Sequence, residues 1–120
     1  MIKTILQHKY DIESFSFDRD FIVTLSSASS SKRLSFGDRV VYTRFYEEEL
    51  ANKNNFSYYN LLGKATGATT LIQDTDSELL KKIEEQSGGI YSAEELKHYI
   101  IIAENHVMDI VSFDEAQEIK

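Results

Sequence analysis

His98 and Asp109 are the two residues of this sequence whose types and spacing could support acid–base chemistry. They belong to two neighbouring apolar stretches that meet at residues 104–105, where an asparagine tolerates the positive φ of a tight turn. A hairpin with residues 104 and 105 in its turn places His98 opposite Val111 and diagonal to Asp109, on the same face of a sheet. An aspartate in that position could orient the imidazole as a general base.

Two further histidines, His8 and His106, complete the set. No nucleophile and no metal-ligating partner stands at a recognisable spacing from any of the three. We therefore expect the histidines to have structural or surface roles, and the sequence predicts no catalytic residue, no metal site and no cofactor. The chain is expected not to be an enzyme.

Carboxylates occur as adjacent groups at residues 47–49, 84–85 and 94–95. Neighbours along a helix point about 100° apart, so such groups do not converge on one ion. The calcium-loop and zinc-hydrolase motifs are absent. Residues 63–67 contain the letters of a phosphate-binding loop in the wrong order, and we interpret them as a plain loop.

A dense group of aromatic side chains is interleaved with arginines in the middle of the chain. Most aromatic residues of a small domain belong to its core. A partly exposed tyrosine and arginine patch is nevertheless the one place where this sequence could form a pocket for a small molecule or a nucleotide. The group comprises Tyr42, Phe45, Tyr46, Phe56, Tyr58 and Tyr59, with Arg39 and Arg44.

Charge is distributed unevenly along the 120 residues. The formal net charge is −7, to which residues 1–70 contribute +1 and residues 71–120 contribute −8. An acidic surface attracts basic proteins and repels phosphate backbones and anionic lipid, so we expect a basic protein partner and no direct binding of nucleic acid. The absence of cysteine favours a reducing compartment, and no apolar run is long enough to span a bilayer, so a cytoplasmic location without membrane contact is expected.

Periodicity predicts a mixture of strands and helices. Alternating apolar residues favour a hairpin of residues 13–17 against 21–25, and a further strand at 69–73. Residues 38–52 contain β-branched residues that favour a strand, but Val41, Phe45 and Leu50 approximate a helical stripe, and we expect a helix there.

Capping signals predict two helical segments in the second half. Thr75 and Glu78 form a capping box ahead of an apolar face, and Gly88 with Gly89 supplies a left-handed stop. A second box, Ser92 with Glu95, opens a short turn of helix that ends at about Lys97. The hairpin that follows is apolar on both faces and should be central in its sheet. The expected fold is therefore a single α+β domain over residues 1–120, an antiparallel β-sheet with two or three helices packed against it.

The acidic character of the domain and the hairpin in residues 97–113 resemble immunity proteins of bacterial contact-dependent-inhibition toxin systems. That resemblance implies an acidic inhibitor that neutralises a cognate basic, nuclease-like toxin domain by covering its active site. Carboxylates would then occupy the positions of substrate phosphates, and aromatic anchors would slow dissociation. The candidate partner-binding residues are Glu84, Glu85, Glu94, Asp114, Glu115, Tyr46, Tyr58 and Tyr59.

Two other classes of function stay open at this level. A phage-type counter-defence protein could mimic nucleic acid with its carboxylates or sequester a nucleotide signal in the tyrosine and arginine region. A small hydrolase or nuclease could use His98 or His106. The sequence leaves homo-oligomerisation open as well.

Overall fold

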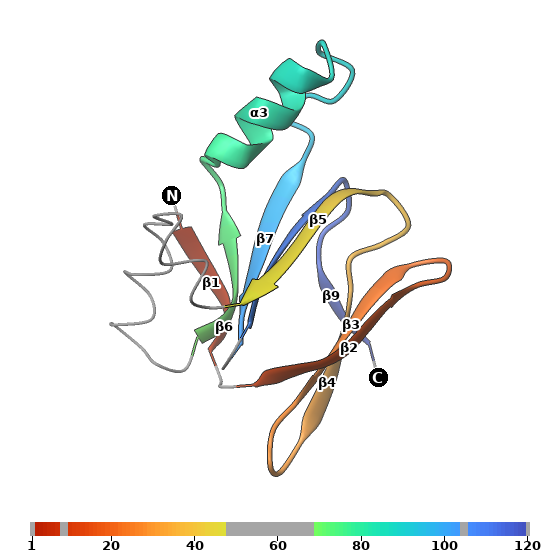
Figure 1. The fold of residues 1–120 in the computed structure, drawn as a ribbon, viewed down its shortest axis with the longest axis vertical. Coiled ribbons are helices and arrows are strands. Elements are labelled where there is room, and N and C mark those ends of the chain that lie inside the picture. Colours follow the sequence, from red (N-terminus) through yellow and green to blue (C-terminus); the bar gives the residue numbers. More distant parts are fainter. Residues whose placement is uncertain (1, 8–9, 48–68, 104–105, 120) are drawn as a thin grey trace.

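The computed structural model describes residues 2–7, 10–47, 69–103 and 106–119, which form two antiparallel β-sheets and one helix (Figure 1). The five-stranded sheet has the order β1 (Ile2–Gln7), β6 (Thr69–Asp74), β7 (Lys97–Ile102), β8 (His106–Ser112) and β5 (Val40–Glu47). The four-stranded sheet has the order β2 (Asp11–Phe17), β3 (Phe21–Ser26), β4 (Ser31–Ser35) and β9 (Gln117–Ile119). The helix is α3 (Glu78–Gln86).

The predicted fold class is wrong. The described part of the chain is mostly β, with one short helix in place of the two or three that were expected. The helix predicted at residues 38–52 is a strand over the part that the structure describes, because β5 runs through Val40–Glu47 and pairs with β8. Its β-branched and aromatic residues suit a pleated strand better than a helix, and pairing with a buried central strand decides between the two.

The main core lies between the two sheets. Val23 and Leu25 of β3 are fully buried and pack in one cluster with Tyr99 and Ile101 of β7 and with Met108 of β8. Alternation along β3 places every second residue in this core. The hairpin of β7 and β8 is central in the five-stranded sheet and buried along most of its length, as its two apolar faces predicted.

Both predicted hairpins are confirmed, and so is the predicted pairing of His98 with Val111. Phe17 pairs with Phe21 at the β2–β3 turn, and His98 pairs with Val111 across β7 and β8. In the β2–β3 hairpin, a shift by one residue would move the buried side chains of β3 to the opposite face, so the apolar pattern specifies the register.

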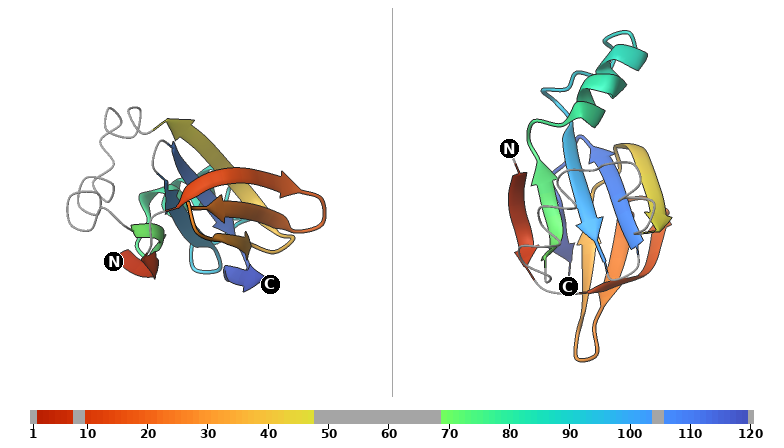
Figure 2. Two further views of the ribbon diagram at one scale, coloured as in Figure 1. Left: turned by 90° about the horizontal axis from the view of Figure 1, so that it is seen from below. Right: turned by 60° about the vertical axis from the view of Figure 1, so that its left-hand side comes forward.

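The helix α3 stands at one end of the five-stranded sheet, opposite the end to which the β3–β4 turn extends (Figure 2). It begins at Ser77 as N-cap, not at the predicted Thr75, and the left-handed stop at Gly88 and Gly89 is confirmed by their φ angles of 64° and 88°. The helix predicted from Ser92 is a hydrogen-bonded turn instead, closed by the Glu95 amide on the Ser92 carbonyl. No helix in the described residues is long and apolar enough to cross a membrane.

Candidate functional site

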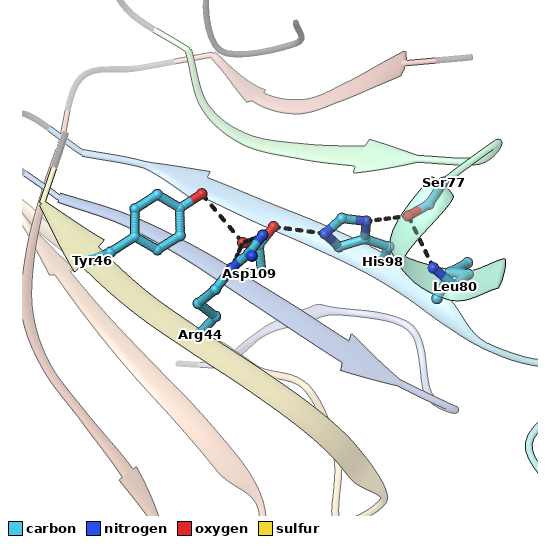
Figure 3. A network of polar contacts seen from close by, with 6 residues as sticks. All are labelled: Arg44, Tyr46, Ser77, Leu80, His98 and Asp109. Carbon is cyan, nitrogen blue, oxygen red and sulfur yellow. Dashed lines mark hydrogen bonds and ion pairs between the residues drawn. The ribbon is translucent and has the colours of Figure 1, made fainter. Parts of the chain in front are cut away.

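A chain of polar side chains crosses the outer face of the five-stranded sheet, on the side away from the main core. Its centre is Asp109, on the central strand β8, whose carboxylate is fully buried. Arg44 lies directly opposite on β5 and donates to Asp109 Oδ2 through Nε at 3.0 Å and Nη2 at 2.9 Å. The Tyr46 hydroxyl donates to the same oxygen at 3.3 Å, and the Arg44 guanidinium lies 5.2 Å from the Tyr46 ring centre (Figure 3).

His98 continues the chain on the other side of the carboxylate. It lies on β7, diagonal to Asp109, and its Nε2 is 2.7 Å from Asp109 Oδ1. Its Nδ1 is 2.6 Å from the hydroxyl of Ser77, the N-cap of α3, and that hydroxyl also accepts from the Leu80 amide at 3.3 Å. Because a carboxylate only accepts, Nε2 carries a proton, and in a neutral imidazole Nδ1 accepts the Ser77 proton. The network thus ties the start of α3 to the middle of the sheet (Figure 3).

Electrostatics keeps Asp109 ionised. Burial by itself would raise the pKa of this carboxyl, but the contacts with His98 and Arg44 outweigh burial and hold the pKa below its ordinary value. Partial burial opposes the charge of Arg44 too, yet the facing carboxylate raises its pKa. No buried side-chain nitrogen or oxygen in the described part of the chain lacks a hydrogen-bond partner. The network is therefore satisfied as it stands, the condition under which a buried polar group stabilises a fold.

The order serine, histidine, aspartate is also that of a nucleophilic triad, but burial argues for a structural role. Ser77 and His98 expose only 3% and 2% of their surface and Asp109 exposes none. The serine hydroxyl is engaged as a helix cap, and a nucleophile must reach a substrate. In the described part of the chain, no three histidine, aspartate or glutamate side chains gather as a metal ion would require. What the arrangement does chemically is hold one buried charge and anchor one helix.

Ion pairs in the folded structure neutralise part of the charge that is unevenly distributed along the sequence. Three acidic groups from the second half pair with cations from the first half, at 2.9, 2.8 and 2.9 Å. The pairs are Lys32 with Glu118, Arg39 with Asp114, and Arg44 with Asp109. Three of the five acids in residues 97–120 are therefore neutralised locally, and the excess negative charge concentrates elsewhere.

That excess lies in residues 74–96, which comprise α3 and the connections on either side of it. They contain seven acids and two lysines, a balance of −5. Glu85, Glu94 and Glu95 are exposed, and no ion pair in the described part of the chain includes any of the three. We call residues 74–96 the acidic end.

A small apolar cluster holds the acidic end against the sheet. Leu80 of α3 and Leu96 of the following turn are buried against Val111 of β8. Partly buried side chains pack around them, and among these is Phe113, whose ring centre is 5.9 Å from that of Tyr91. The acidic end is therefore a fixed part of the protein surface.

The eight residues predicted to bind a partner are not all alike in the structure. Glu85 and Glu94 are exposed on the acidic end, whereas Glu84 is half-buried and its Oε1 accepts from the Ala93 amide at 3.2 Å. Glu115 is exposed between β8 and β9.

The remaining candidates are held by the fold or cannot be placed. Asp114 is paired with Arg39, and Tyr46 belongs to the buried network. Tyr58 and Tyr59 lie outside the described residues. Both arginines of the predicted tyrosine and arginine patch are bound to carboxylates, so that region is a structural ion-pair site as far as it is described.

Sequence reasoning missed Arg44 and Ser77 as members of the network. Arg44 was assigned to a helix, although the alternation of Tyr42, Arg44 and Tyr46 is the period of a strand and places all three on one face. For Ser77 the signal was ambiguous, because several polar residues that could cap a helix follow one another from Asp74.

Comparison with known proteins places the chain in no group. No protein family matches it, and neither a curated protein nor a solved structure matches it either.

Proposed function

We propose that this protein is an acidic binding protein that neutralises a cognate basic protein, such as a nuclease-like toxin domain, by covering its active site. The single observation that carries the proposal is the concentration of charge at the acidic end, −5 over residues 74–96, after local ion pairs have neutralised carboxylates elsewhere. A field concentrated at one place steers association with a basic surface better than the same charge spread evenly.

The position of the charge supports a docking surface. The acidic end projects from one end of the five-stranded sheet and is fixed to it by the Leu80 cluster and by the Ser77 cap (Figures 1 and 2). A rigid, projecting, negatively charged element can enter the cleft in which a basic enzyme binds its substrate. The carboxylates would stand where substrate phosphates bind.

Charge reversal tests the proposal. The protein is co-expressed with the basic proteins encoded beside its gene, and both complex formation and protection of the host cell are measured. Glu85→Lys, Glu94→Lys and Glu95→Lys combined should abolish binding at about 150 mM salt. The matched control reverses three exposed acids of the β2–β3 hairpin, Glu13 in β2 and Asp18 and Asp20 in the turn, and should retain binding.

Two results would contradict the proposal. One is that no basic neighbour binds the wild-type protein; the other is that the two triple variants lose binding equally, which would make net charge, not the acidic end, responsible.

A further inference from the structure

The loop that follows α3 presents an apolar side chain in the middle of the acidic end. Ile90 exposes 80% of its surface, and Tyr91 beside it exposes 36%. Single exposed apolar residues are common and by themselves mean little. Ile90 differs because of how the loop holds it and what surrounds it.

The loop is held by a complete set of local hydrogen bonds. All five backbone N–H groups of residues 87–91 donate, at distances between 2.9 and 3.3 Å. Their acceptors are carbonyls of α3, the Ser87 carbonyl and the Ser87 hydroxyl, which itself donates to the Glu84 carbonyl at 3.0 Å. Such a loop loses little conformational entropy on binding.

Two glycines make this geometry available. Gly88 and Gly89 both adopt positive φ, where other residues are strained, and a Cβ atom at either would meet no atom within 4 Å. Backbone conformation, and not lack of space, therefore requires glycine at both positions. The chain reverses at once after α3 and places Ile90 at the surface.

The chain on either side of Ile90 carries an aromatic contact to the sheet and exposed carboxylates. Tyr91 is in contact with the Phe113 ring, which links the loop to the sheet. Exposed carboxylates of Glu85, Glu94 and Glu95 belong to the same short segment of chain. An apolar centre with a charged rim is the usual anatomy of a protein-binding hot spot.

We propose that Ile90 and Tyr91 are the apolar anchor with which the acidic end docks on a basic protein, entering an apolar pocket bordered by lysine or arginine. This inference rests on the proposed function, and it assigns binding energy to the loop and encounter rate to the surrounding carboxylates. Charge complementarity identifies the occupant as a basic protein and argues against a second copy of this acidic chain.

Site-specific photo-crosslinking tests the anchor directly. A benzophenone amino acid replaces Ile90 in the protein expressed in its own host, and in a matched control it replaces Ile5, an exposed isoleucine of β1 (43% exposed). Irradiation should crosslink the Ile90 probe, and not the Ile5 probe, to a basic protein, which is identified by mass spectrometry.

The partner identified by crosslinking is then purified, and its affinity for variants of this protein is measured. Ile90→Ser should weaken binding roughly 10-fold or more, mainly through faster dissociation and equally at low and high salt. Ile5→Ser should leave affinity within about 2-fold, and both variants should unfold at the wild-type temperature.

Each remaining outcome overturns the inference in a recognisable way. If a basic protein binds but Ile90→Ser changes its affinity less than about 2-fold, or only the Ile5 probe crosslinks, the anchor is wrong while the proposed function survives. If the Ile90 probe captures a second copy of this chain, an acidic protein or nothing, the anchor is wrong, and the co-expression experiment then decides whether the proposed function survives.

Discussion

The two ends of α3 are capped by serines in very different environments. Each end of a helix leaves backbone groups without partners, and a serine serves at each, Ser77 at the start and Ser87 at the end. Ser77 is buried and connects the helix to His98 and Asp109 in the middle of the sheet. Ser87 bonds only to its own neighbourhood and leaves the next residues exposed.

The difference in burial between the two ends of α3 means that one end contributes to stability and the other is available for binding. Polar groups at the start of α3 are out of water, so losing one partner there leaves another without a hydrogen bond. Polar groups at the end of α3 can turn to water at little cost. We therefore expect substitutions at the start to change the free energy of unfolding, and substitutions at the end to change binding.

The largest effect should follow removal of the central carboxylate. Asp109→Ala leaves the buried His98 N–H without its acceptor, removes the charge that faces Arg44 and opens a small void, so the free energy of unfolding should fall by about 3 kcal/mol. Urea denaturation at neutral pH measures this loss.

The control for that experiment is a second Arg–Asp pair, which, unlike Arg44 and Asp109, lies at the surface. Asp114→Ala removes the partner of Arg39, both of which are solvent-accessible, and should cost far less than Asp109→Ala. Equal losses from the two variants would show that burial of Asp109 contributes nothing.

The next largest loss of stability is expected at Ser77, and Ser87 provides the comparison. Ser77→Ala removes the N-cap and leaves His98 Nδ1 without its partner, and we expect a loss of about 2 kcal/mol in the free energy of unfolding. Ser87→Ala removes hydrogen bonds that water can replace and should cost less than about 1 kcal/mol. The comparison is made by urea denaturation of the two variants side by side, and it fails if Ser87→Ala is the more destabilising.

The sequence was sufficient for the glycine stop after α3 and for one long-range contact. The diagonal placement of His98 and Asp109 followed from an assumed two-residue turn at residues 104–105, and the structure confirms it, with His98 Nε2 2.7 Å from Asp109 Oδ1. The glycine stop after α3 was equally readable, because positive φ is a local requirement.

The sequence was insufficient where a partner strand decides the outcome. Residues 40–47 carry both a strand signal and a helix-like stripe, and the choice depends on pairing with β8, some 65 residues further along the chain. With a helix assumed there, Arg44 could not be placed opposite Asp109. This wrong element removed Arg44 from the predicted network and, together with the helix predicted from Ser92, made the predicted fold class wrong.

The smallest expected change in the free energy of unfolding occurs only at acid pH. It separates the contribution of the Asp109 charge from the contribution of its packing. Its folded pKa is lowered, so its contribution to stability is complete above the unfolded pKa of about 3.9 and declines as the pH falls through the folded pKa. Asp109→Ala lacks that contribution at every pH. The difference in free energy of unfolding between wild type and variant should therefore narrow as the pH falls below about 4.

Urea denaturation of both proteins at intervals down to about pH 3 measures that difference. Every other carboxyl titrates in both proteins and cancels from it. The part that remains at the lowest pH reports the lost hydrogen bonds and the void, which do not depend on ionisation. A difference that stays constant through the acid range would mean that the Asp109 carboxylate is no more stabilised in the folded protein than in water, contrary to its contacts with His98 and Arg44.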